Sequence, residues 1–319
     1  MQERYDVIII GGGPAGLTAG LYTSRASLRT LLVERLMPGG LAATTDVVEN
    51  YPGFPEGISG PELMQRFEQQ AVRFGLEIRM GEVQAISIRG RDRVVSLDDG
   101  ELLAGALIIA AGSRPRKLGV PGEDTFRGRG VSYCATCDGP LYRDAVLAMV
   151  GGGDSAVKEG IFLTKFARKV LLIHRRDELR ASGVTRDRAL NNEKIEFVWN
   201  SVVEEIVGET TVSAVQIRNV KTGERSTLKV DGVFIFVGTE PNTDFVKGTL
   251  KVDEKGYLVA NRNTQTLVPG IFAAGDVQEE FAQQIAVAVG HGAQAAMMAE
   301  RYLSEHRAAH DFKSWAALR

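Results

Sequence analysis

Residues 5–16 read YDVIIIGGGPAG, an apolar run that leads directly into a glycine-rich turn. A short run that is almost entirely apolar is typical of a strand buried on both faces of a parallel sheet. Gly11 allows a tight turn, Gly13 lets the backbone approach a ligand, and Gly16 lets a helix pack closely on the strand. The stretch therefore predicts an α/β unit that binds the pyrophosphate of a dinucleotide at a helix N-terminus.

The residues that follow complete this pattern. A helix is expected over 17–24 and a second strand over 29–33, closed by Glu34, which is placed to bond a ribose hydroxyl. An ordinary glycine turn is the alternative, and the full order of strand, helix, strand and acid disfavours it. The residues expected to contact this first dinucleotide are Gly11, Gly13, Pro14, Ala15, Gly16 and Glu34.

The same order recurs in the middle of the chain. A strand over 145–150 leads into GGGDSA at 151–156, and a helix over 155–166 and a strand over 170–173 follow. At the ribose position the chain has His174-Arg175-Arg176 and then Arg180 instead of an acid. Arginines suit a ribose 2′-phosphate, so the pattern favours NADPH, although a charge run can also be a solvated face. The expected nucleotide contacts are Gly151, Gly153, Asp154, Ser155, Ala156, His174, Arg175, Arg176 and Arg180.

Between the two fingerprints lie the only cysteines of the chain, Cys134 and Cys137, spaced C-x-x-C and followed by Asp138. Two cysteines are too few for a disulfide scaffold, so the pair is predicted to be reactive. Asp138 is placed to act as a general acid or base, or is simply a turn residue before a glycine. Two nucleotide sites and one dithiol indicate electron transfer from nicotinamide through a flavin to a disulfide.

Composition sets the remaining limits. The chain has 319 residues, which favours two domains. Its net charge of −2, with both signs interspersed, does not suggest a nucleic-acid surface. No apolar run approaches the roughly 20 residues that span a membrane, and the first strand begins within a few residues of the N-terminus, which leaves no signal peptide. We therefore expect a soluble cytoplasmic enzyme.

The rest of the chain predicts connecting structure. Antiparallel meanders are expected over 83–109 and over 202–236, the latter with strands at 202–207, 212–217 and 228–236. A strand ending in Gly275-Asp276 is placed to hold a ribityl hydroxyl, and a long helix is expected over 284–306. We expect hinges where the chain crosses between domains, near 117–119 and 243–244.

These residues resemble a known family, the low-molecular-weight, bacterial-type thioredoxin reductases. The resemblance runs nearly end to end, and the Cys-Ala-Thr-Cys-Asp sequence between two fingerprints is its most specific part. The matching stretches are 11–16, 49–53, 134–139, 151–156, 174–180 and 272–276.

The resemblance implies two Rossmann-like, three-layer ββα domains. The FAD domain would consist of residues 1–117 and 245–319, and the inserted NADPH domain, residues 118–244, would carry the redox-active disulfide. It also implies a homodimer, thioredoxin as the substrate, Cys137 beside the flavin and Cys134 as the thiol that attacks the partner. The further FAD contacts expected are Gly40, Leu41, Asn50, Ala111, Gly112, Gly275, Asp276, Gln283 and Gln284.

The chain departs from the family in three places. Leu41 replaces the usual Gln near the flavin, Gln283-Gln284 replaces Arg-Gln, and Lys158-Glu159 replaces two acids. The first two alter the expected hydrogen bonding of the flavin and leave the dithiol untouched.

Other functions remain as alternatives. The chain could be a flavin reductase of another thiol-disulfide partner, glutaredoxin-like or peroxidase-linked, although relatives that serve peroxidases carry an added N-terminal thiol domain. Ferredoxin–NADP reductases of similar shape lack the dithiol. A flavin-bound redox sensor would have no use for both the dithiol and the arginines.

Overall fold

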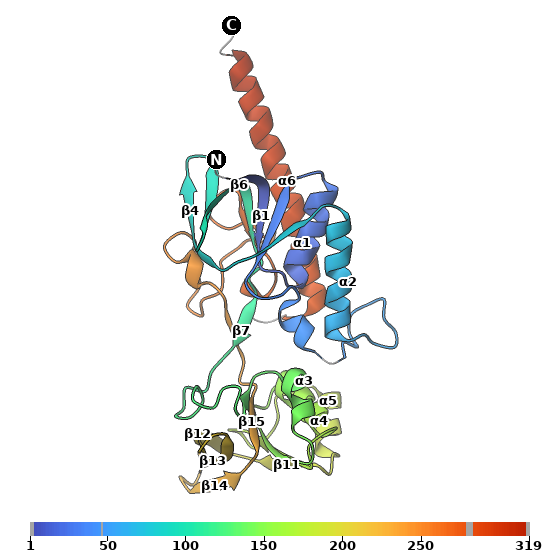
Figure 1. The fold of residues 1–319 in the computed structure, drawn as a ribbon, viewed down its shortest axis with the longest axis vertical. Helices are drawn as coiled ribbons and strands as arrows, with labels where there is room; N and C mark the ends of the chain where they lie inside the picture. Colours follow the sequence, from blue (N-terminus) through green and yellow to red (C-terminus); the bar gives the residue numbers. More distant parts are fainter. Residues whose placement is uncertain (1–2, 46, 279–282, 317–319) are drawn as a thin grey trace. The chain divides into compact units, whose positions relative to one another are not determined.

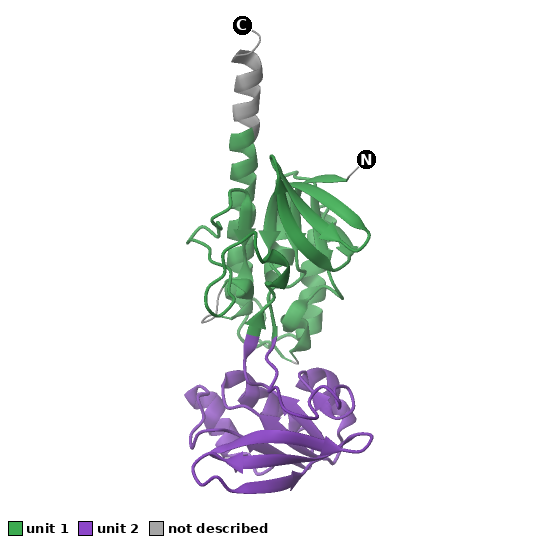
Figure 2. Ribbon diagram, turned by 90° about the vertical axis from the view of Figure 1, so that its left-hand side faces the viewer, with its two compact units in different colours: residues 1–114, 240–319 green, residues 115–239 purple. Residues whose placement is uncertain are grey.

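The chain divides into two compact units, shown in different colours in Figure 2. The computed structural model describes residues 3–45, 47–278 and 283–316, with side chains as far as His306. Unit 1 consists of Met1–Arg114 and Glu240–Arg319, and unit 2 of Pro115–Thr239. Unit 1 is therefore assembled from both ends of the chain, and unit 2 is one continuous insertion.

Unit 1 is built on one mixed sheet, whose strands follow the order β3-β2-β1-β6-β5-β4, with β17 also paired to β6. The strands β3, β2, β1, β6 and β17 are parallel, and β4, β5 and β6 form an antiparallel meander. Their bounds are β1 (Arg4–Ile10), β2 (Thr30–Glu34), β3 (Glu77–Met80), β4 (Val83–Arg89), β5 (Asp92–Leu97), β6 (Gly100–Ile109) and β17 (Ile271–Ala273). The predicted meander over 83–109 is confirmed.

Three helices cover one face of this sheet, and Figure 1 shows them on the same side. Val7 and Ile9 point into this helical layer, and Ile8 and Ile10 point into the core on the other face, as the period of two along a buried strand requires. The helical elements are α1 (Pro14–Arg25), α2 (Gly60–Arg73), α6 (Ile285–Ala316) and the short turns η1 (Gly40–Thr44), η3 (Asp244–Val246) and η4 (Gly275–Val277).

Unit 2 also combines parallel strands with an antiparallel meander, but here they form two separate sheets. A parallel sheet has the order β11-β10-β9-β15-β8, and β12-β13-β14 form an antiparallel sheet. The parallel strands are β8 (Val131–Ser132), β9 (Val146–Val150), β10 (Lys169–Ile173), β11 (Ile195–Val198) and β15 (Gly232–Ile235). The antiparallel strands are β12 (Ser201–Gly208), β13 (Val212–Asn219) and β14 (Arg225–Lys229), and the helical elements are α3 (Ala135–Asp138), η2 (Gly139–Leu141), α4 (Asp154–Leu163) and α5 (Gly183–Leu190).

The single strand predicted over 228–236 is wrong. The chain forms β14 and then β15, which leaves the meander and pairs in parallel with β9. Asp231 lies at the break, where its N–H donates to the carbonyl of Val146 and its carboxylate accepts the Val146 N–H, both at 2.8 Å. Gly232 follows, and a Cβ there would lie 2.7 Å from the Tyr142 ring. These contacts anchor the break beside β9.

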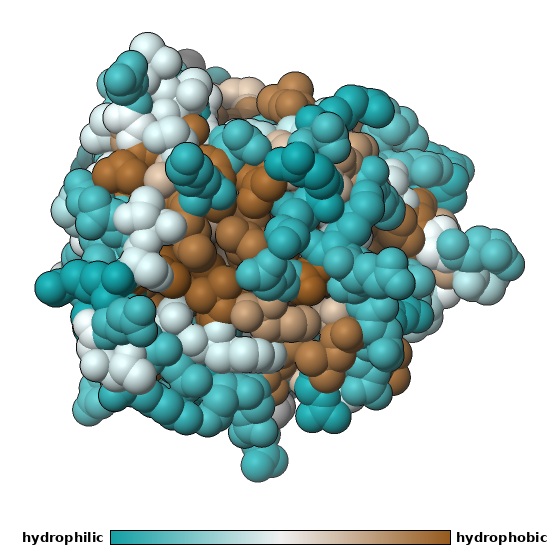
Figure 3. All heavy atoms as spheres, turned by 90° about the horizontal axis from the view of Figure 1, so that it is seen from below, coloured by the Kyte–Doolittle hydropathy of each residue, from teal (hydrophilic) through white to brown (hydrophobic). Residues whose placement is uncertain are grey.

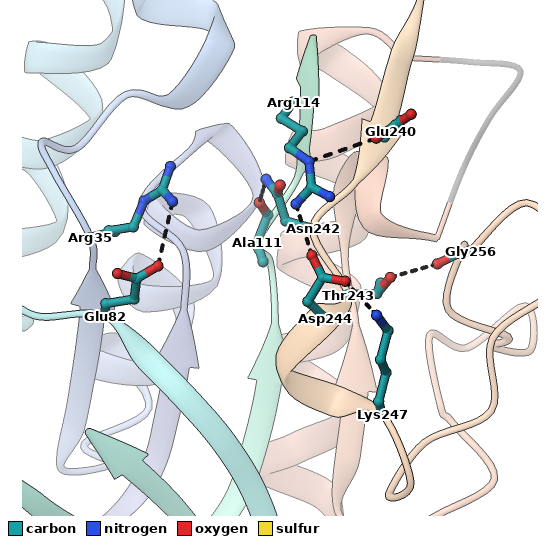
Figure 4. A network of polar contacts seen from close by, with 10 residues as sticks. All are labelled: Arg35, Glu82, Ala111, Arg114, Glu240, Asn242, Thr243, Asp244, Lys247 and Gly256. Atoms are coloured by element: carbon teal, nitrogen blue, oxygen red, sulfur yellow. Dashed lines mark hydrogen bonds and ion pairs between the residues drawn. The ribbon is translucent and has the colours of Figure 1, made fainter. Parts of the chain in front are cut away.

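Two chain segments connect the units through β7 (Ser113–Pro115) and β16 (Thr239–Pro241), which pair with each other. Within unit 1, Asn242 donates to the carbonyl oxygen of Ala111 at 2.8 Å. Arg114 forms ion pairs with Asp244 at 2.9 Å and with Glu240 at 3.8 Å (Figure 4). The two segments are therefore bonded to each other where they leave this unit.

The molecular surface is mixed in character. Figure 3 shows apolar side chains gathered in the middle of one face, with hydrophilic residues around them. Among the described residues, no helix has the length and apolar character needed to cross a membrane.

Packing of α6 on α1 gives a stability test with an internal control. A Cβ at Gly292 would lie 2.2 Å from the Ala15 carbonyl oxygen, whereas a Cβ at Gly290, in the same helix, would meet nothing within 4 Å. We expect Gly292→Ala to destabilise the protein by about 1–3 kcal/mol through overpacking. Gly290→Ala should stabilise it by about 0.5–1 kcal/mol because alanine is the better helix former. Urea unfolding followed by circular dichroism measures both, and equal effects would contradict the close contact.

Candidate functional site

The first glycine loop has the close contacts that a dinucleotide site requires. Gly11 has φ +104°, and a Cβ there would lie 2.4 Å from the Ala110 carbonyl oxygen. A Cβ at Gly16 would lie 1.8 Å from the Gly11 carbonyl oxygen. At Gly13, in contrast, nothing lies within 4 Å of the added atom. The loop is therefore packed tightly against neighbouring backbone at Gly11 and Gly16. It is open at Gly13, where a pyrophosphate is expected.

The start of α1 is free to receive an anion. Gly13 is the N-cap and provides no side-chain hydrogen bond, and Pro14 opens the helix. N–H groups of the first turn lack partners within a helix, and the helix dipole favours a negative group there. The geometry fits a pyrophosphate held by backbone groups.

Glu34 lies at the end of β2 beside this loop. Its Oε2 accepts the Gly12 N–H at 2.6 Å and its Oε1 accepts the Leu36 N–H at 3.1 Å. These bonds fix the carboxylate and leave lone pairs on both oxygens, since a carboxylate accepts about four hydrogen bonds. The arrangement fits an acceptor for ribose hydroxyls.

Other expected flavin contacts come together around the loop. A Cβ at Gly40 would lie 3.3 Å from the Gly13 Cα, and one at Gly275 would lie 2.9 Å from the Ala15 Cβ. The segments at 39–41 and 275–277, distant in sequence, therefore both reach the first fingerprint.

The structure also gives the surroundings of Leu41, Gln283 and Gln284, in the segments that depart from the family pattern. Leu41 is 39% exposed, and its side chain offers no hydrogen bond. Gln284 Oε1 accepts a hydrogen bond from Asn50 Nδ2 at 2.9 Å. Gln283 Nε2 donates to the Tyr257 hydroxyl at 3.4 Å. The residues just before α6 are therefore bonded to Asn50 and to Tyr257.

The second glycine loop belongs to unit 2. A Cβ at Gly151, where φ is +147°, would lie 2.3 Å from the Phe236 carbonyl oxygen. At Gly152 an added Cβ would lie 2.3 Å from His174 Nδ1, so this glycine is what admits the ring. The Arg180 N–H donates to the Gly152 carbonyl oxygen at 2.8 Å. The loop, His174 and Arg180 thus form one cluster, as the sequence predicts.

His174 is buried at the end of β10. Burial is the main cause that lowers the pKa of its imidazole, and Arg180, Arg176 and Arg175 lower it further. The ring meets Trp199 edge to face, with 6.5 Å between centroids. Trp199 lies just beyond β11, a strand that the sequence pattern did not predict.

The basic cluster is available for an anion. Arg175, Arg176 and Arg180 are exposed, and within the described parts of the chain none of them forms an ion pair. Asp177, which directly follows Arg176, binds Lys221 at 2.5 Å, and this contact lowers the pKa of its carboxyl group. A Cβ at Gly153 would lie 3.8 Å from Arg180 Nη2, so this guanidinium group borders the second glycine loop.

The dithiol lies at the start of the short helix α3. Cys134 and Cys137 form a disulfide, and the Sγ of Cys134 accepts the N–H of Cys137 at 3.1 Å. An N–H directed at a sulfur favours the thiolate over the thiol. Asp138 ends this helix; its charge is a secondary cause, after burial, that raises the pKa of Tyr142.

Most of the chain matches known proteins. Residues 5–292 match the family of pyridine nucleotide-disulphide oxidoreductases. The thioredoxin reductase of Mycolicibacterium smegmatis is 48% identical over 305 residues, 95% of this chain and 98% of that protein.

This chain belongs to that oxidoreductase family, among the thioredoxin reductases. A bifunctional thioredoxin reductase/thioredoxin of Mycobacterium leprae is 49% identical over 96% of this chain and 67% of that protein. The solved structure of thioredoxin reductase from Lactococcus lactis has a TM-score of 0.92 and 44% identity, over 94% of this chain and 99% of that one. The resemblance and the fold class predicted from the sequence are confirmed, and a flavin and a pyridine nucleotide are the implied cofactors. The role of each individual site residue stays a prediction.

Substitutions at two glycines of the first loop should distinguish an effect on cofactor binding from an effect on folding. Gly13→Ala should leave the fold intact, because space is open there, yet weaken FAD binding about 5- to 150-fold by crowding the pyrophosphate, a cost of about 1–3 kcal/mol. Gly16→Ala should instead lower the yield of folded protein, since its Cβ would meet the Gly11 carbonyl. Flavin fluorescence titration and far-ultraviolet circular dichroism measure the two effects. A Gly13→Ala variant that binds FAD normally would remove the pyrophosphate from this position.

Proposed function

We propose that this chain is an FAD-containing, NADPH-dependent thioredoxin-disulfide reductase. The observation that carries the proposal is the disulfide of Cys134 and Cys137, which lies in the unit that also holds the second glycine loop and the unneutralised arginines. The dithiol supplies the reaction with a disulfide partner, and the arginines favour a phosphorylated ribose.

The two units divide the cofactors between them in this proposal. Unit 1, close to the predicted 1–117 and 245–319, binds FAD through the loop at Gly11–Gly16 and through Glu34. Unit 2, close to the predicted 118–244, binds NADPH and carries the dithiol. FAD held by these residues would supply two-electron chemistry, and the hydride of NADPH together with one proton from the solvent would reduce the disulfide to two thiols.

The chain's own residues then carry the exchange. The Cys134 thiolate, stabilised by the Cys137 N–H, attacks one sulfur of the partner disulfide, and the other partner sulfur leaves as a thiolate. Cys137 attacks the mixed disulfide, releases the reduced partner and restores the internal disulfide. In this proposal Asp138 exchanges a proton with a departing thiolate.

The choice of partner is the finer part of the proposal. Thioredoxin is supported by the names of the relatives and by the relative whose name joins reductase and thioredoxin in one chain. The alternative is a glutaredoxin-like or peroxidase-linked protein. A homodimer in the cytoplasm follows from the same resemblance, and sedimentation of the holoenzyme tests the dimer.

NADPH oxidation in the presence of a panel of disulfide proteins tests the function. We expect rapid turnover with one or more bacterial thioredoxins and little with glutaredoxins. Turnover with glutaredoxins alone would show that a glutaredoxin, not thioredoxin, is the partner. No turnover with any protein of the panel would overturn the proposal.

Single cysteine variants assign the two thiols. Cys134→Ser should form no mixed disulfide with a partner, yet keep a thiolate-to-flavin absorbance band after reduction, since Cys137 is the sulfur beside the flavin in this proposal. Cys137→Ser should trap the mixed disulfide and lose the band. Absorbance spectra and non-reducing gels of the two variants decide the assignment, and the opposite pattern reverses it.

Arginine variants test the nucleotide. Replacing Arg175, Arg176 or Arg180 with Ala should raise the KM for NADPH about 10- to 150-fold, because a hydrogen bond to a charged group contributes about 1.5–3 kcal/mol. The KM for NADH, which lacks the phosphate, should change little.

Arg168→Ala is the matched control, since Arg168 is exposed at the amino end of β10, whereas the site lies at its carboxyl end. Steady-state kinetics with both nucleotides measure the effect. Equal increases in the KM for NADPH and for NADH would show that these arginines do not bind the 2′-phosphate.

A further inference from the structure

Unit 2 contains a buried acid that neither the fingerprints nor the dithiol chemistry uses. Glu123 lies in the turns between β7 and β8 and is 2% exposed. Its Oε1 accepts the Leu118 N–H at 2.9 Å and the Tyr133 hydroxyl at 2.5 Å, and its Oε2 accepts the Gly119 N–H at 2.6 Å. Three donors surround the group, as an acceptor-only carboxylate requires, and within the described residues no Lys or Arg pairs with it.

One of these three donors belongs to the residue next to Cys134 in the sequence. Tyr133 immediately precedes Cys134, and its phenol donates to Glu123. Burial, and then the hydrogen bond to Glu123, raise the pKa of the phenol, so it remains a donor. The backbone of Cys134 is held as well, because the Ser132 hydroxyl accepts its N–H at 3.0 Å and donates to its carbonyl at 3.2 Å.

The residues just before Glu123 are fixed to the antiparallel sheet of unit 2. The Pro121 carbonyl accepts the N–H of Ile206, on β12, at 3.0 Å. Gly122 has φ +86°, and a Cβ there would lie 1.9 Å from the Ile206 carbonyl oxygen. The segment that carries Glu123 therefore packs directly on β12. Glu123 links this anchored segment to the residue before Cys134.

We propose that Glu123 and Tyr133 form a clamp that positions Cys134 for attack on the disulfide of a partner protein. Neither residue contacts the reacting sulfurs in this scheme, so both are positioning residues. The step they serve forms a bond between Cys134 Sγ and one partner sulfur, while the partner S–S bond breaks and its second sulfur leaves as a thiolate. The inference rests on the proposed function, because it assumes that the partner is a protein.

Protein partners should depend on the clamp more than small disulfides do. A docked protein presents its disulfide in one orientation, so Cys134 must lie in line with it, and small misplacements cost large factors in rate. A small aromatic disulfide adjusts its own orientation in solution. The clamp should therefore affect the two substrates differently.

The experiment uses the FAD-loaded holoenzyme and three variants. Tyr133→Phe removes only the hydroxyl, and Glu123→Gln keeps the shape but replaces an acceptor with a donor group. Tyr5→Phe is the matched control, since the Tyr5 hydroxyl also bonds carboxylates, those of Glu3 and Glu77, in unit 1. The measurements are kcat/KM with a bacterial thioredoxin and with dithiobis(nitrobenzoate), thermal midpoint, and the rate at which iodoacetamide alkylates Cys134 in the reduced enzyme.

For Tyr133→Phe and Glu123→Gln we expect kcat/KM with thioredoxin to fall about tenfold and that with the small disulfide to stay within about twofold. Alkylation of Cys134 should become faster by about twofold or more as its segment loosens. Tyr5→Phe should change none of these rates.

Two outcomes would overturn the clamp. If both substrates lose activity in parallel with the thermal midpoint, Glu123 and Tyr133 only hold the fold. If no rate changes in Tyr133→Phe, the hydroxyl positions nothing. A wild-type enzyme that reduces no thioredoxin would instead overturn the proposed function, and the alkylation rate of Cys134 would still decide whether the clamp controls that thiol.

Discussion

The structure depends on close approach of a helix start to the end of a buried strand, made possible by glycines with no Cβ. In unit 1 a Cβ at Gly16, in α1, would lie 1.8 Å from the Gly11 carbonyl oxygen, and in unit 2 a Cβ at Gly151 would lie 2.7 Å from the Ala156 Cβ, in α4. Any side chain would separate these elements by more than the packing of a protein interior allows. N–H groups of a first helical turn lack partners within the helix, so the same constraint that shapes the fold also underlies the predicted anion sites.

Long-range assembly completes each site. β6 pairs with β1, β5 and β17, so it joins the meander and the last strand to the first fingerprint. α6 packs on α1 through Gly292, which brings Gln284 near the loop at Asn50. The first site therefore draws on both ends of the chain.

Exposed and buried charges in unit 2 contribute to the structure in different ways. Exposed pairs such as Lys221 with Asp177 contribute little to stability, since such contacts are typically worth about 0–1 kcal/mol. This pair nevertheless engages Asp177, the acid nearest in sequence to Arg175 and Arg176. Glu123 is the opposite case, because a buried carboxylate must be fully hydrogen-bonded, and its three donors fix the backbone on both of its sides.

The sequence by itself determined the elements whose pattern is local. The fingerprints at Gly11 and Gly151, the strands and helices around them, and the C-x-x-C pair follow from spacing that short-range sterics enforce. The split of 228–236 into β14 and β15 could not be read in the same way, because pairing with β9 and the bonds between Asp231 and Val146 decide it.

Only the tertiary structure decided which side chains meet. Gly40 and Gly275 lie far from the first fingerprint in sequence, and folding alone brings them against Gly13 and Ala15. Glu123 was not distinguishable from a solvated acid in a polar turn, since nothing local reveals that it is buried or that Tyr133 reaches it. Spacing along the chain encodes backbone geometry, whereas burial and hydrogen-bond partners depend on contacts between residues distant in sequence.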